Sequence, residues 1–249
     1  MTLLTALVPG ALCAAALGRA WPDGIDGQVR CIDEGSRALG LAFCGPPRPD
    51  EARDPDSVAA GLVATPGALP VLGVVPGPLS DELLSKNHRR GGNLACSSAD
   101  RDVQDLLDDA SDAAVDRIRS LGVCGVRRAA VVEEAAASWA GDQAAAEAHR
   151  PLLNAAAHLR IDLVLVASGL DDVESLGYDR WVSEMGCSPG LGYLTAEAFD
   201  SAAALERGLD RIRAAGEPEE VVTAPLAGSV SPGLVRQAAR ALAQVVARP

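Results

Sequence analysis

Short apolar runs alternate with longer amphipathic segments along most of this chain. The apolar runs predict short strands at 41–44, 69–75, 126–132, 161–167 and 220–224, with weaker candidates at 178–182 and 191–194. Apolar residues at helical spacing predict intervening helices over 29–39, 100–121, 138–159 and 199–215, and a last one from Pro232 onward. Strands that alternate with helices indicate an α/β protein with a parallel sheet.

Glycine and serine positions predict where several of these helices begin and end. Gly40, Gly122 and Gly216 each follow the last apolar residue of a helical pattern, where glycine is a favoured C-cap. Ser231 and Pro232 form a favourable N-cap and first-turn pair for the last helix.

The length and the strand count together favour a closed barrel over an open sheet. The chain has 249 residues, close to the ~250 of a (β/α)8 TIM-type barrel. We therefore predict a single barrel domain over 29–249, preceded by an N-terminal extension over 1–28. A Rossmann fold is disfavoured, because Gly190-Leu-Gly192 lacks the third glycine of the dinucleotide-binding motif.

The amino-acid composition disfavours some kinds of binding partner. Apolar residues make up 48% of the chain, enough for a sizeable core, and the net charge of −12 disfavours nucleic acid as a partner. No apolar run reaches the ~18 residues of a membrane span, so we expect no membrane partner. A homodimer is compatible with the sequence.

The thiols and the N-terminus indicate a cytoplasmic protein. The six cysteines are widely spread, with no C-x-x-C pair, which favours reduced thiols. The apolar N-terminus could be a signal sequence, but it lacks a basic start and is interrupted by Pro9-Gly10. Lys86, the single lysine, lies in a polar run, which disfavours Schiff-base chemistry.

Glu133 and Glu134 are the leading catalytic candidates, because they end the strand predicted over 126–132. Parallel α/β proteins place their chemistry at the carboxyl ends of strands. Side chains alternate along a strand, so only one of the two can face a barrel mouth, and we favour Glu134. It would serve as a general base or as an anchor for a cationic or hydroxylated substrate. The alternative is a helix N-terminal carboxylate beside a solvated surface charge.

Other candidates follow further strand ends. Arg48, Arg89 and Arg90 could bind an anionic substrate, although each is also typical of a surface loop. Cys187 lies in a glycine-flanked loop and is the better candidate for a reactive thiol, whereas Cys44 fits a small buried hydrophobe. Ser168 ends the strand over 161–167 and offers a hydroxyl for substrate binding.

Several segments resemble the uroporphyrinogen decarboxylase and cobalamin-independent methionine synthase superfamily. The helix with Pro151 and the following strand over 161–166 are similar to a helix and strand of that superfamily, and Val131-Val-Glu-Glu-Ala135 resembles its strand that ends in acidic-Glu-Pro. The runs Leu72–Pro78 and Phe199–Pro225 are also similar. The resemblance implies a TIM barrel, here with trimmed peripheral elements.

The departures from that pattern limit what the resemblance implies. The methyltransferase branch binds zinc through His-x-Cys at a strand end where this chain has Val166-Ala167-Ser168, so we expect no metal and no cofactor. Arg19-Ala-Trp-Pro-Asp23 is a poor match to the arginine-rich signature of the decarboxylase branch. We first expect a metal-free, decarboxylase-like lyase. The alternatives are a non-catalytic barrel that binds a ligand or partner, and a methyltransferase.

Overall fold

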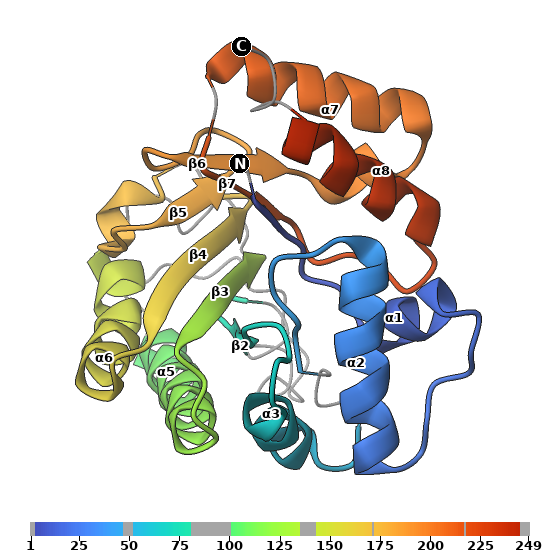
Figure 1. The fold of residues 1–249 in the computed structure, drawn as a ribbon. Helices are drawn as coiled ribbons and strands as arrows, with labels where there is room; N and C mark the ends of the chain where they lie inside the picture. Colours follow the sequence, from blue (N-terminus) through green and yellow to red (C-terminus); the bar gives the residue numbers. More distant parts are fainter. Residues whose placement is uncertain are drawn as a thin grey trace.

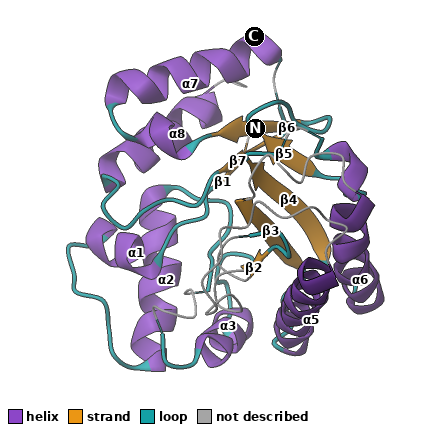
Figure 2. Cartoon of the chain, turned by 180° about the vertical axis from the view of Figure 1, so that it is seen from behind, coloured by secondary structure: helices purple, strands orange, loops and turns teal. Residues whose placement is uncertain are grey.

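The computed structural model shows two parallel sheets that form the wall of a TIM-type barrel (Figures 1 and 2). The larger sheet has the strand order β2-β3-β4-β5, with bounds Leu72–Pro76, Arg128–Glu134, Asp162–Ser168 and Trp181–Ser183. The smaller has the order β1-β7-β6, with bounds Leu3–Thr5, Glu220–Thr223 and Leu191–Leu194. The structure describes residues 3–46, 52–80, 101–134, 143–170, 172–216 and 218–244.

Helices surround the strands, as expected for an α/β barrel (Figure 2). Their bounds are Gly10–Ala16 for α1, Ile25–Leu39 for α2, Pro55–Ala64 for α3, Arg101–Val123 for α5, Gln143–Leu159 for α6, Ala202–Ala215 for α7 and Pro232–Gln244 for α8. Two 3-10 turns, η2 (Glu174–Leu176) and η3 (Ala196–Phe199), complete the described elements. None of the described helices is both long enough and apolar enough to cross a membrane.

The segment 41–44 joins the two sheets on one side of the barrel. The amide of Ala42 donates to the carbonyl of Leu4 in β1 at 3.2 Å. Cys44 accepts from Leu72 at 2.9 Å and forms a parallel bridge with Val71. The strand predicted here is therefore a bridge between β1 and β2. Together with the seven described strands, this segment supplies the eight strand positions of a (β/α)8 barrel.

Strands β5 and β6 are not paired with each other, so the barrel wall is open between them. This differs from the closed barrel that we predicted. The loop after β5 folds back on β5 and forms an antiparallel bridge between Val182 and Cys187. Ser183 donates to Gly186 at 2.8 Å, and Ser188 donates to Trp181 at 2.9 Å. The loop thus takes the strand edge that β6 would need, and we call this interruption the seam.

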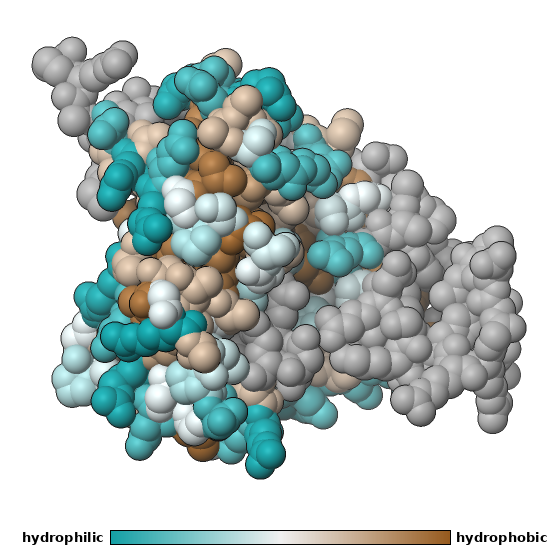
Figure 3. Space-filling model, turned by 90° about the vertical axis from the view of Figure 1, so that its right-hand side faces the viewer, coloured by the Kyte–Doolittle hydropathy of each residue, from teal (hydrophilic) through white to brown (hydrophobic). Residues whose placement is uncertain are grey.

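Three apolar clusters follow from the alternation of side chains along the strands. Val132, Val164, Val166 and Val222 point inward and belong to the cluster that fills the barrel. The two other clusters lie outside the wall, one mainly against α3, α5 and α6, the other mainly against α1, α7 and α8. The surface in Figure 3 is mixed, with hydrophobic residues gathered near its middle and hydrophilic ones toward its edges.

Some predicted helix ends are confirmed and one is wrong. Gly40 caps α2 in the left-handed conformation, with φ of 78°, and the Ser231 hydroxyl accepts from the Gly233 amide at the start of α8. Gly122 does not cap α5. The helix continues to Val123, and Gly125 takes the left-handed position, with the amide of Val126 bonded to the carbonyl of Leu121.

The N-terminal segment that we expected to be an extension takes part in the barrel. Leu3–Thr5 forms β1 and pairs with β7. α1 packs closely against α2, since a Cβ atom on Gly35 would lie 2.7 Å from the backbone oxygen of Cys13. Residues 3–16 therefore contribute one strand and one helix to the fold.

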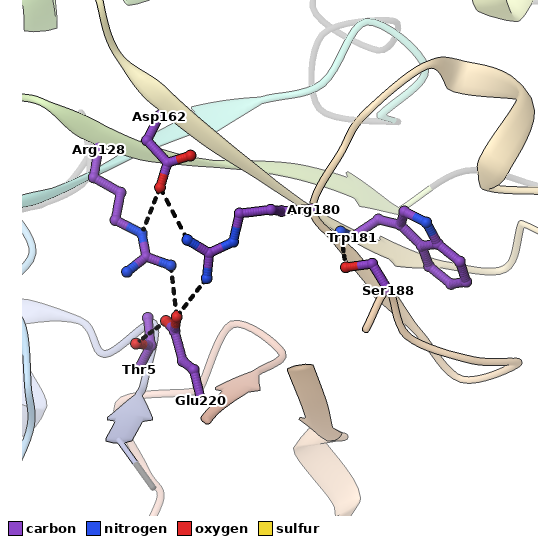
Figure 4. Close-up of polar contacts among 7 residues, drawn as sticks. All are labelled: Thr5, Arg128, Asp162, Arg180, Trp181, Ser188 and Glu220. Atoms are coloured by element: carbon purple, nitrogen blue, oxygen red, sulfur yellow. Dashed lines mark hydrogen bonds and ion pairs between the residues drawn. The ribbon is translucent and has the colours of Figure 1, made fainter. Parts of the chain in front are cut away.

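Ion pairs fill the amino-terminal end of the barrel (Figure 4). We call Arg128, Asp162, Arg180 and Glu220 the basal ion cluster. Glu220 Oε2 lies 2.7 Å from Arg128 and 2.6 Å from Arg180, and both arginines also contact Asp162. Thr5 donates a hydrogen bond to the same Glu220 carboxylate. The cluster joins the β2–β5 sheet to β7 of the other sheet.

Candidate functional site

The carboxyl ends of the strands surround a small cavity opposite the basal ion cluster. We call it the mouth cavity; its volume is about 170 Å³. Strands β3, β4 and β6 and the chain after β7 contribute to its wall, because all of them run parallel. Its polar side chains are those of Glu134, Ser168, Glu184, Tyr193, Thr195 and Glu197.

Side chains alternate between the two faces of β3, so the adjacent Glu133 and Glu134 point to opposite sides. Glu134 has the same parity as the inward-facing Val132, is exposed, and lines the mouth cavity. Glu133 is fully buried on the other face of the strand, toward the helices. The structure thus brings only Glu134 to the mouth with its side chain accessible.

Glu133 belongs to a buried network with His149 of α6 and Tyr178. Glu133 Oε1 accepts from the Leu79 amide at 3.0 Å and lies 3.0 Å from His149 Nε2. His149 Nδ1 lies 2.9 Å from the Tyr178 hydroxyl. Burial raises the pKa of Glu133, opposed by the contacts from His149 and Leu79. The network holds the end of β3 against α6 and the chain after β2.

Four polar residues of the mouth cavity were not predicted from the sequence: Glu184, Tyr193, Thr195 and Glu197. Burial raises the pKa of Tyr193, and the nearby charges of Glu184 and Glu197 raise it further, so its hydroxyl keeps its proton at neutral pH. Hydrogen bonds from its own backbone amide and from Thr195 lower the pKa of Glu197, which stays ionised. Each lies at or just after the carboxyl end of a short strand, which is the signal that could have identified them.

Ser168 and Cys187 have different surroundings. Ser168 lines the mouth cavity, and its hydroxyl donates a long hydrogen bond of 3.5 Å to the Glu133 carbonyl. Cys187 lies in the seam, packed against the apolar interior of the barrel. Burial raises the pKa of Cys187, which disfavours the thiolate that a nucleophile requires.

The predicted basic residues cannot be placed at this site. Arg48, Arg89 and Arg90 lie outside the described residues. Within the described part of the chain, no ion pair involves Glu134, Glu184 or Glu197. The described mouth is therefore acidic.

The described residues do not fit the zinc site that the resemblance would imply. No group of three His, Cys, Asp or Glu side chains among them is arranged to hold a metal ion. Ser168 stands at the strand end where that site needs His and Cys, and Cys187 lies in the seam.

Comparisons with known proteins support the fold. No protein-family model and no curated protein matches the sequence. A solved methyltransferase from Methanosarcina mazei is similar, with a TM-score of 0.65 and 11% identity, over 98% of this chain and 94% of that one. A DUF72 family protein from Thermotoga maritima is similar with a TM-score of 0.52 and 11% identity, over 99% and 100%. At such identity these likenesses show a TIM-barrel type of fold and nothing finer.

Proposed function

We propose that this protein is a small-molecule enzyme that binds a cationic or hydroxyl-rich substrate in the mouth cavity, with Glu134 as its proton-transfer group. The observation that carries the proposal is the set of carboxylates and hydroxyls at the carboxyl ends of the strands, where TIM barrels keep their chemistry. Carboxylates accept hydrogen bonds from ammonium and hydroxyl groups, and a protonated Tyr193 can donate one.

Glu134 suits proton transfer better than Glu133. Its side chain is exposed at the cavity, whereas Glu133 is buried and already accepts the Leu79 amide. A general base must lie within hydrogen-bond reach of the proton that it abstracts. Glu133 would then support the site by fixing the strand end that carries Glu134.

A decarboxylase-like lyase acting on an anionic substrate is less well supported. Such a substrate would need cations at the mouth, and the described mouth is acidic. Methyl transfer is a second candidate because the Methanosarcina mazei methyltransferase matches nearly all of the chain. Without a fitting zinc site, a methyl acceptor here would rely on Glu134 for deprotonation.

Three four-carbon ligands that differ in charge test the proposal. Butylammonium and butane-1,4-diol should bind, as measured by ligand-observed NMR, and butyrate should not, because the mouth carboxylates repel it. Glu134→Gln should weaken butylammonium binding about tenfold or more, since it removes a charge-assisted hydrogen bond. Glu174→Gln, an exposed substitution in η2, is the matched control. Preferred binding of butyrate would contradict the proposal.

A turnover assay distinguishes an enzyme from a non-catalytic barrel. Mixed amines and polyols are incubated with the protein in D2O, and their NMR signals are followed over time. Loss or deuterium exchange of a signal with the native protein, but not with Glu134→Gln, supports catalysis. Binding without any such change would favour the non-catalytic alternative.

A further inference from the structure

We propose that the substrate site continues from the mouth cavity through the seam into a larger groove, and that this groove binds the apolar chain of an amine-bearing substrate. We call it the side groove. It lies between the loop after β5 and the end of α7 and has a volume of about 750 Å³. The proposal rests on the proposed function and adds the class of substrate.

The two hollows share part of their walls. Glu184, Tyr193, Thr195 and Glu197 line both the mouth cavity and the side groove. In this proposal, a ligand whose head group lies at Glu134 passes these four residues to reach the side groove.

The sizes of the two hollows also favour one extended ligand. The mouth cavity, at about 170 Å³, is smaller than the ~300–1,000 Å³ typical of small-molecule sites. The side groove, at about 750 Å³, lies within that range. The mouth alone fits a small head group, and the groove supplies the space for the remainder of the molecule.

The seam explains why the groove exists. In a regular (β/α)8 barrel a helix follows each strand and covers the wall outside it. Here β5 is followed by a loop that folds back on its edge, and the chain passes directly to β6 at Leu191. No described helix lies between β5 and β6, which leaves the space beside the loop and α7 open.

The side chains of the groove set the chemistry and the direction of the ligand. Met185 is 74% exposed there, and Ile212, Ala215 and Pro218 add apolar wall. Arg211 belongs to the groove alone, whereas Glu184 and Glu197 lie where the groove meets the mouth. Arg211 would repel an ammonium group, so the ammonium belongs at the Glu134 end and the apolar chain in the groove.

A series of n-alkylammonium ions from methyl to octyl tests the inference. The dissociation constants are measured by ligand-observed NMR below micelle-forming concentrations. Each added methylene should tighten binding about two- to fourfold until the groove is filled. A dissociation constant that does not change with chain length would overturn the inference.

Two adjacent substitutions on α7 provide the matched comparison. Ala215 lines the groove and Ala214, also exposed, does not. Ala215→Trp should abolish the gain with chain length and leave methylammonium binding unchanged, whereas Ala214→Trp should preserve the gain. Met185→Ser, which shortens the groove wall, should reduce it. Equal behaviour of the two tryptophan variants would also overturn the inference.

The outcomes for the two proposals differ. Glu134→Gln should weaken every member of the series by a similar factor, because it acts on the head group. If methylammonium binds in a Glu134-dependent way and longer chains add nothing, only the side groove is refuted. If long chains bind equally well with and without the Glu134 carboxylate, the proposed function fails and the groove remains.

Discussion

The two glutamates at the end of β3 are one residue apart, so they lie on opposite faces of the strand and have different roles. Glu133 has a buried carboxylate whose Oε1 contacts both the Leu79 amide and His149. Its Oε2 is also buried and has no hydrogen-bond partner among the described residues. The side chain is thus held by one oxygen, while the other adds to the cost of burying a charge.

Glu133→Gln should therefore change the free energy of unfolding by less than about 1 kcal/mol, since an amide oxygen can still accept from Leu79 and the buried charge is removed. Glu133→Ala should cost about 2–4 kcal/mol, because Leu79 and His149 lose their partner and a cavity opens. Urea unfolding curves measure both values. Equal stability of the two variants would argue against this network.

At the scale of elements, α1 and α2 approach each other closely at Gly35. A Cβ atom added to Gly35 would lie 2.6 Å from Cys13 Cβ and 2.7 Å from its backbone oxygen. Backbone cannot move away as a flexible side chain can, so only glycine fits at this contact. The packing shows that α1 is an integral part of the barrel.

Gly35→Ala should lower the free energy of unfolding by about 1–3 kcal/mol through overpacking. Gly24→Ala is the control, because Gly24 is the N-cap of α2 in an extended conformation and its Cβ would meet nothing within 4 Å. It should cost a few tenths of a kcal/mol, as expected for alanine in place of glycine at an N-cap. Thermal unfolding of both proteins distinguishes the two costs.

Patterns among neighbouring residues predicted helices, strands and helix caps. They did not predict the contacts between distant parts of the chain. Gly40, Ser231 and the alternation at Glu134 depend on neighbouring residues, and the structure agrees with each. β1 was missed because its partner, β7, lies more than 200 residues later and its three residues carry little pattern. Glu184 and Glu197 were missed because the strands before them are short.

For the whole molecule, the basal ion cluster links the two sheets through ion pairs to Glu220. Burial alone would raise the pKa of Glu220, but hydrogen bonds from Thr5 and Arg128 and the charges of Arg128 and Arg180 lower it. Arg128 also stacks on Phe43, with 4.7 Å from its guanidinium carbon to the ring centroid. The cluster is buried at Glu220 and more open at Asp162.

The lowered pKa of Glu220 predicts acid sensitivity. Its contribution to stability is complete above the pKa of an unfolded glutamate, about 4.3, and is lost as the pH falls through the lower folded value. In Glu220→Gln, the free energy of unfolding should fall less steeply than in the native protein below about pH 4.3. At neutral pH this substitution should cost about 3 kcal/mol, because Arg128 and Arg180 lose their buried carboxylate partner and keep only the more exposed Asp162. Urea unfolding at several pH values tests this, with Glu174→Gln as control.

The fold-back loop at the seam also has a consequence for the motions of the barrel. A barrel in which every strand is hydrogen-bonded to both neighbours must open as a unit. A barrel with a gap between two strands can open first at that gap. The hydrogen bonds between Ser183 and Gly186 and between Ser188 and Trp181 border this gap. Their amides should exchange with deuterated solvent earlier than those of β3 and β4, which are paired along both edges.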